Sequence, residues 1–136
     1  MRVLADPDPH TLPVPPTGMR VLVVDNDPDA VDLVVTDLTL EGHQVVGTAY
    51  DGVSAIAMCQ ALMPDVMVVD VRMPPGPTGV DVVTAVRGQR GLRCIVYTNY
   101  RDTLLRRTVA RLGAVFLVKG ELVALREAVL GPPVAG

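Results

Sequence analysis

The strongest constraint on the fold is a regular alternation of short β-branched runs with segments of helical periodicity. The predicted strands are Arg20–Val24, Gln44–Ala49, Val66–Val69, Arg93–Tyr97 and Ala114–Val118. A helical segment follows each strand, and such alternation implies a parallel sheet with right-handed crossovers and helices on both faces. The sequence therefore predicts an α/β fold built on a five-stranded parallel sheet.

Start and stop residues support the five helices. Asp27 and Pro28 suit the first turn of the first helix, and Gly42 suits its end. Asp102 is expected to cap the fourth helix, which Gly113 ends. The apolar residues at helical spacing are Val31, Val34, Val35 and Leu38; Val53, Ile56 and Ala57; Val82, Val83 and Val86; Leu105, Val109 and Leu112; and Leu122, Leu125 and Val129.

Length and composition indicate one folded unit, residues 19–131, between a proline-rich disordered tail, residues 1–18, and a short tail, residues 132–136. No apolar run approaches the ~20 residues of a membrane span. A net charge of -3 argues against a dedicated nucleic-acid binder. Cys59 and Cys94 lie in apolar patterns without metal-site spacing, so we expect buried free thiols in a reducing cytoplasm.

Basic residues are unevenly distributed. Seven of the twelve lie between positions 87 and 111, where Asp102 is the one acid. This segment is either a solvated arginine face or a docking site for an acidic partner. His10 and His43 have no Cys, His or acid at ligand spacing, so we expect both to be exposed.

Four polar residues come directly after predicted strands. Asp25, Asp70, Thr98 and Lys119 follow the first, third, fourth and fifth strands. Because the carboxyl ends of parallel strands share one edge of the sheet, the topology brings these four residues together. Lys119 is the only lysine in the chain.

Two carboxylates at one edge repel each other by a few kcal/mol at an effective dielectric of about 20. Lys119 supplies one compensating charge, and Mg²⁺, which prefers carboxylate and carbonyl oxygens, would supply two. A carboxylate, a metal, a lysine and a hydroxyl together suit phosphoryl transfer to the carboxylate, which gives an acyl phosphate.

Four motifs in order resemble the receiver domain of response regulators in two-component signalling. They are Val-Leu-Val-Val-Asp25-Asn26-Asp27-Pro, Val-Val-Asp70-Val-Arg-Met73-Pro74, Tyr97-Thr98 and Gly113-Ala114-Val-Phe116-Leu-Val-Lys119. The resemblance covers Met19 to about Leu130 and implies the CheY-like (βα)5 fold with strand order 2-1-3-4-5.

The resemblance also implies residue roles. Asp70 would accept a phosphoryl group from a histidine kinase or phosphotransfer protein, with Lys119 and Thr98 stabilising it. Asp25, Asp70 and the backbone carbonyl of Arg72 would hold Mg²⁺. Thr98 and Phe116 fall at the family's switch positions. Signalling output would appear on the face of the fourth helix, fifth strand and fifth helix, which also allows a homodimer.

The chain departs from the family pattern near the metal. Asn26 stands where a second acid is usual, so we expect weaker Mg²⁺ binding unless Asp27 compensates. Gly120 replaces the proline that commonly follows the lysine, so the cis peptide should be lost.

Other departures concern access to the site. Asn99 is larger than the residue usual there, and it could hinder the phosphodonor or the attacking water. Met73 is a second access position, and the Arg72 side chain could reach the phosphoryl group.

The sequence therefore predicts a single-domain response regulator that is phosphorylated on Asp70 and signals by binding an unknown output protein. We expect it to catalyse only its own phosphorylation and dephosphorylation, and not to be an enzyme in the ordinary sense. The alternatives are a receiver-like binding module that works without phosphorylation and a small aspartyl-nucleophile phosphatase. The phosphatase is disfavoured by Arg72, which stands where a general acid would be needed. In a flavodoxin-like flavin carrier, Asp25 and Asp70 would repel the flavin phosphate.

Overall fold

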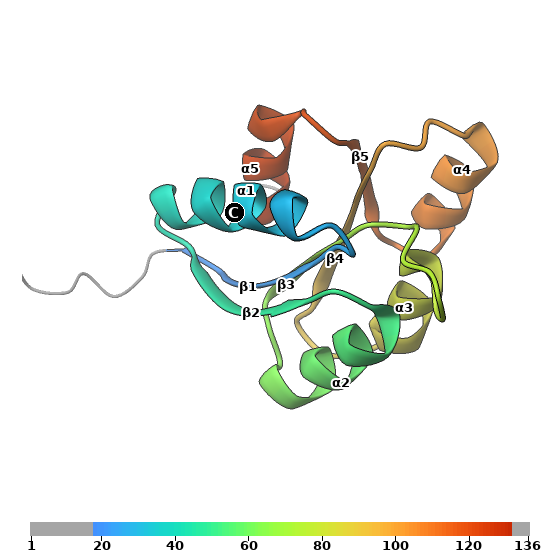
Figure 1. Ribbon diagram of the computed structural model, residues 1–136, viewed down its shortest axis with the longest axis horizontal. Coiled ribbons are helices and arrows are strands. Elements are labelled where there is room, and N and C mark those ends of the chain that lie inside the picture. The colour runs from blue at the N-terminus through green and yellow to red at the C-terminus, as the bar shows by residue number, and fades with distance from the viewer. Residues whose placement is uncertain (1–17, 132–136) are drawn as a thin grey trace, which may run out of the picture.

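A computed structural model describes residues 18–131, which alternate between strands and helices throughout (Figure 1). The strands are β1 (Arg20–Val24), β2 (Gln44–Ala49), β3 (Val66–Val69), β4 (Arg93–Thr98) and β5 (Val115–Val118). The helices are α1 (Pro28–Leu40), α2 (Gly52–Leu62), α3 (Gly79–Val86), α4 (Thr103–Arg111) and α5 (Leu122–Leu130). The tail predicted for residues 1–18 falls outside this description except for Gly18, and residues 132–136 fall outside it entirely.

All five strands are parallel and form one sheet in the order β2-β1-β3-β4-β5. This confirms the predicted fold and strand order. Val24 of β1 is in register with Val69 of β3, and Val69 with Val96 of β4. The carboxyl ends of the three central strands are therefore nearly level, and the residues that follow them meet at one edge.

The sheet separates two apolar cores because successive side chains of a strand point to opposite faces. On β1, Leu22 and Val24 pack in the core under α2, α3 and α4, whereas Val21 and Val23 pack in the core under α1 and α5. Figure 1 shows α1 and α5 on one side of the sheet and α2 and α3 on the other. The central strands are buried on both faces, as their continuous apolar sequence requires.

The predicted caps of α1 and α4 are confirmed. The Asp27 carboxylate accepts a hydrogen bond from the Asp29 N–H, and the Asp102 carboxylate accepts one from the Leu104 N–H. Each cap satisfies an N–H group that has no partner inside its helix.

Two details differ from the sequence-based expectations. Val53 is 67% exposed and Ala57 is also exposed, because α2 packs through Gly52, Ala55 and Cys59 instead. His43 was predicted to be exposed but is buried, and its Nδ1 atom accepts a hydrogen bond from the Met19 N–H at 2.9 Å. Ile56, the third residue of that apolar pattern, does pack against the core, so the pattern identified only part of the buried face of α2.

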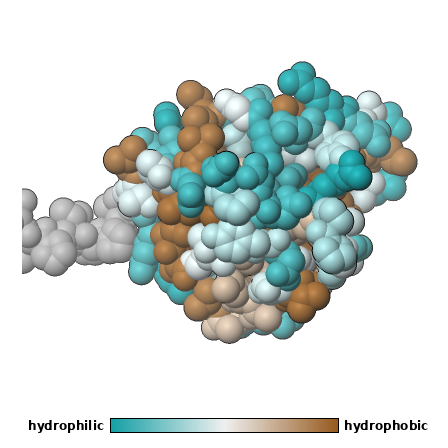
Figure 2. Space-filling model, in the orientation of Figure 1, coloured by the Kyte–Doolittle hydropathy of each residue, from teal (hydrophilic) through white to brown (hydrophobic). Residues whose placement is uncertain are grey.

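Cys59 and Cys94 are buried free thiols, as predicted, and burial raises the pKa of Cys94 to about 12. No helix within residues 18–131 has the length and apolar character needed to cross a bilayer. Figure 2 shows a hydrophobic band on the side of the molecule where β2 forms the edge of the sheet.

Candidate functional site

Asp25, Asp70, Thr98 and Lys119 line one cavity of about 450 Å³ at the carboxyl edge of the sheet. Main-chain hydrogen bonds continue the sheet pattern past the strand ends: the Asp70 N–H donates to the Val24 carbonyl at 3.1 Å, and the Lys119 N–H donates to the Thr98 carbonyl at 2.9 Å. The positions of these four residues therefore follow from the register of the sheet.

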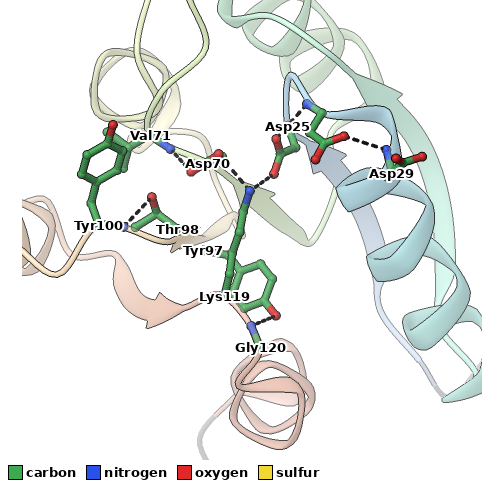
Figure 3. Close-up of polar contacts among 10 residues, drawn as sticks. Asp25, Asp29, Asp70, Val71, Tyr97, Thr98, Tyr100, Lys119 and Gly120 are labelled. Atoms are coloured by element: carbon green, nitrogen blue, oxygen red, sulfur yellow. Dashed lines mark hydrogen bonds and ion pairs between the residues drawn. The ribbon is translucent and has the colours of Figure 1, made fainter.

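The Lys119 ammonium lies between the two acids (Figure 3). Its Nζ atom is 2.6 Å from Asp25 Oδ2 and 3.1 Å from Asp70 Oδ2. The remaining oxygens accept main-chain hydrogen bonds: the Asp27 N–H donates to Asp25 Oδ1 at 2.9 Å, and the Val71 N–H donates to Asp70 Oδ1 at 2.7 Å. Both carboxylates are thus fixed in orientation by main chain on one side and by ammonium on the other.

The charges in this cavity perturb one another. Burial raises the pKa of Asp25, and repulsion from Asp70 adds to this, while the hydrogen bonds from Lys119 and from the Asp27 N–H oppose it. Burial alone would lower the pKa of Lys119, but its hydrogen bonds to both acids and their negative charges outweigh burial and raise it. Lys119 therefore stays positively charged. Its single positive charge faces two carboxylates, so the three groups together carry a net negative charge when both acids are ionised.

The carboxylate oxygens of this cavity are ligands of the kind that a hard divalent cation prefers. Asp25 and Asp70 present two carboxylate oxygens to a common point, and Mg²⁺ in proteins commonly takes only one or two carboxylates and keeps waters as its other ligands. Asn26 and Asp27 both line the cavity, where Asn26 is exposed and the Asp27 carboxylate caps α1. Within residues 18–131, no three His, Cys, Asp or Glu side chains form a ready-made metal cluster.

The mouth of the cavity carries a pair that the sequence did not indicate. The Arg72 guanidinium donates to the Tyr100 hydroxyl and lies 5.5 Å from the centre of the Tyr100 ring. Arg72, Asn99 and Tyr100 all line the cavity, and the Tyr100 N–H donates to Thr98 Oγ1 at 3.3 Å. The sequence left open that Arg72 could reach the phosphoryl group; in this structure its guanidinium contacts the Tyr100 side chain.

Phe116 lies outside this cavity. It is half-buried, and the Arg106 guanidinium lies 4.6 Å from its ring centre, a cation–π contact between α4 and β5. Phe116 and Arg106 line a neighbouring hollow of about 520 Å³ together with Arg101 and Lys119. Lys119 therefore borders both the acidic cavity and this basic hollow.

The loop after β3 is held against Asp70 by close packing. The Gly79 N–H donates to the Val71 carbonyl at 2.8 Å, and a Cβ atom at Gly79 would lie 2.0 Å from the Asp70 carbonyl oxygen. Met73 was predicted to control access, but its side chain is buried in the core under α2, α3 and α4 and is not part of the cavity wall. The packing of this loop, rather than any pattern in the sequence, shows which side chains it turns inward.

Within residues 18–131 the one cis peptide bond joins Pro74 and Pro75. The Lys119–Gly120 bond is trans, as the glycine predicted. Gly120 has φ +98° and donates its N–H to the Tyr97 hydroxyl at 2.8 Å. The sequence gave no indication of this contact, because Tyr97 was predicted only as the last residue of a strand.

Comparison with known proteins decides the family. Residues 21–129 match the model of the response regulator receiver domain. The chain belongs to the response-regulator receiver family. Its structure superposes on the signal receiver domain of the putative response regulator NarL from Mycobacterium tuberculosis with a TM-score of 0.77 and 33% sequence identity, covering 86% of this chain and 100% of that one.

Curated relatives of this receiver include longer regulators. It is 44% identical over 73 residues to the probable transcriptional regulatory protein NarL of M. tuberculosis, covering 53% of this chain and 33% of the relative. It is 34% identical over 87 residues to the DNA-binding response regulator MtrA of Mycolicibacterium smegmatis, covering 62% and 36%. The matched segments span about a third of each relative's length.

Proposed function

We propose that this receiver accepts a phosphoryl group on Asp70 from a phosphohistidine of a sensor kinase or phosphotransfer protein, and signals through phosphorylation-dependent protein binding. The observation that carries the proposal is the Lys119 ammonium bridging Asp25 and Asp70 in the cavity that also contains Thr98. This arrangement concentrates a nucleophile, a cation and a hydroxyl at one point.

In the transfer step, one Asp70 oxygen bonds to phosphorus while the phosphorus–nitrogen bond to the donor histidine breaks. The electron pair of that bond returns to the imidazole nitrogen, and the product is an acyl phosphate. Asp70 is aligned for this attack because the Val71 N–H and Lys119 fix its carboxylate. Lys119 then pairs with a phosphoryl oxygen, and the buried Thr98 hydroxyl donates to another.

Mg²⁺ would be held by Asp25, Asp70 and the Arg72 carbonyl, with Asn26 as a weak ligand and Asp27 as a further candidate. When bound it would supply positive charge that offsets the phosphoryl oxygens. Two carboxylates facing a single ammonium support this assignment, because the three groups together carry a net negative charge that a cation would offset.

The signal would leave through the basic hollow beside the site. Movement of Thr98 toward the phosphoryl group breaks its hydrogen bond from the Tyr100 N–H and frees the start of the loop before α4. Phe116 then turns inward and leaves Arg106, which changes the face of α4, β5 and α5. An acidic output partner suits the arginines exposed there.

The test is incubation of the chain with acetyl phosphate and Mg²⁺, followed by intact mass. We expect the mass to rise by one phosphoryl group in wild type and in Asp32→Asn, an exposed aspartate of α1. Asp70→Asn should stay unmodified, because an amide is not a nucleophile toward phosphorus. An unmodified wild type would refute the proposal.

That negative result would favour the second candidate, a receiver-like module that binds a partner without phosphorylation. Asn26 is the observation in its favour, because it removes one acid from the edge where the metal would bind.

A further inference from the structure

The loop that carries Lys119 is attached to β4 at two successive residues. The Lys119 N–H donates to the Thr98 carbonyl at 2.9 Å, and the Gly120 N–H donates to the Tyr97 hydroxyl at 2.8 Å. Figure 3 shows this second contact at the main-chain end of Lys119, away from its ammonium. Adjacent residues of β4 thus hold adjacent residues of the loop, one through main chain and one through a side chain.

We propose that Tyr97 is a positioning residue for phosphoryl transfer, whose hydroxyl fixes the backbone after Lys119 and thereby holds the ammonium between Asp25 and Asp70. The inference rests on the proposed function, in which Lys119 stabilises the transferring group. It assigns to Tyr97 a role in the site although its ring lies on the opposite face of the sheet from α2, α3 and α4, in the core under α1 and α5.

The backbone conformation of residue 120 explains why the hydrogen bond to Tyr97 is needed. Gly120 has φ +98°, a conformation that favours glycine, and no atom lies within 4 Å of the place a Cβ would occupy. Backbone conformation and not space therefore selects glycine. A glycine after the lysine leaves the loop free to take many conformations, and the hydrogen bond to Tyr97 removes that freedom. A proline at this position would have no N–H to donate.

The surroundings of Tyr97 make it a stiff anchor. The residue is only 5% exposed and is packed with Leu125 and Val129 of α5 and Ile95 of β4. A buried phenol requires a hydrogen-bond partner, and the Gly120 N–H provides it. Gly120 itself is exposed, so water can replace the phenol when it is removed. Loss of the hydroxyl should therefore disturb position more than stability.

The experiment compares wild type, Tyr97→Phe and a control, Tyr50→Phe, at a tyrosine that is 45% exposed. With acetyl phosphate and Mg²⁺, Tyr97→Phe should be phosphorylated about tenfold more slowly, because an ammonium no longer held between the two acids stabilises the transition state less. Its melting temperature should stay close to wild type, and Tyr50→Phe should match wild type in both measurements.

If Tyr97 acts through Lys119, the effects of substituting these two residues on the phosphorylation rate should not add. In a Lys119→Met background, Tyr97→Phe should have no further effect on the phosphorylation rate, whereas a general structural role would slow both backgrounds equally. Equal slowing in both backgrounds, or a Tyr97→Phe rate equal to wild type, would overturn the proposal.

Crystal structures of wild type and Tyr97→Phe separate failure of this inference from failure of the proposed function. We expect the Lys119 Nζ atom in Tyr97→Phe to leave its place between the two acids. If wild type is not phosphorylated but the lysine moves, the signalling function fails and the positioning role stands. A lysine that keeps both contacts in Tyr97→Phe would disprove the positioning role, whatever the phosphorylation result.

Discussion

Replacement of Lys119 by methionine tests the centre of the site most directly. The substitution keeps most of the aliphatic length and removes the ammonium that lies 2.6 Å from Asp25 and 3.1 Å from Asp70. It leaves two buried carboxylates facing each other with no cation between them. We expect Lys119→Met to fold, to melt at a lower temperature and to be phosphorylated much more slowly than wild type.

The magnitude follows from burial and distance. At an effective dielectric of 20, the two contacts are worth about 5–6 kcal/mol of gross attraction each. Desolvation of three charges cancels much of this, and loss of one partner costs about 3–5 kcal/mol in buried pairs and under about 1 kcal/mol in exposed ones. The side chains of Lys119, Asp25 and Asp70 are 19%, 7% and 11% exposed, which is nearer the buried case. We therefore expect a loss of about 2–3 kcal/mol, or about 10 °C in melting temperature.

The assay is thermal unfolding across pH, with Arg107→Met as a control that removes an exposed cation of α4. Because the pKa of Lys119 is raised in the fold, its contribution is complete below the ordinary value of 10.5 and is lost as pH rises through the higher folded value. The difference between wild type and Lys119→Met should therefore persist at neutral pH and shrink in strong alkali, where Lys119 loses its charge.

A second substitution and added metal refine this test. Asp25→Asn in the Lys119→Met background should recover stability, because it removes one of the two opposed charges. Mg²⁺ should raise the melting temperature of Lys119→Met more than that of wild type, because the uncompensated carboxylates bind it more tightly. If Lys119→Met has the same melting temperature as the Arg107→Met control, Lys119 does not offset repulsion between Asp25 and Asp70 in one cavity.

Asp25→Asn alone should stabilise the protein by about 0.5–2 kcal/mol at neutral pH, the range common for substitutions that relax a strained functional site. Because the pKa of Asp25 is raised in the fold, its protonated form stabilises wild type fully below the ordinary pKa of 3.8. This stability is lost as pH rises through the higher pKa of the folded state. In denaturation curves, the advantage of Asp25→Asn over wild type should therefore vanish near pH 4. Gly79→Ala should cost at least about 1–3 kcal/mol by urea unfolding, since its Cβ would overlap a carbonyl oxygen, and Gly88→Ala, with open space around it, should not. Arg72→Ala, which frees the Tyr100 ring at the cavity mouth, should change the rate of acyl phosphate hydrolysis followed by mass; an unchanged half-life would show that the pair does not limit access for water.

Prediction from sequence was strongest where local chemistry and topology act together. Asp27 and Asp102 were identified as helix caps because their side chains satisfy N–H groups two residues away. Asp25 and Lys119 were expected at one edge because a parallel sheet leaves no other place for residues that follow its strands. These inferences needed no knowledge of side-chain packing.

Prediction failed where partners are distant in sequence and carry no periodic pattern. His43 was expected in solvent, yet it is buried against Met19, 24 residues away. Met73 was expected at the cavity and lies in the core, because the loop after β3 turns it inward. The Arg72–Tyr100 pair joins two loops that follow different strands.

The amino-acid sequence by itself determined the parallel α/β sheet, the five helices and the set of polar residues at the strand ends, since hydrophobic period, caps and chain connectivity are properties of short segments. Only the tertiary structure decided that the ammonium of Lys119 bridges two acids and that the hydroxyl of Tyr97 holds the glycine behind it. Such contacts depend on side-chain direction to within about an ångström, and that precision arises only when the strands, helices and loops have packed against one another.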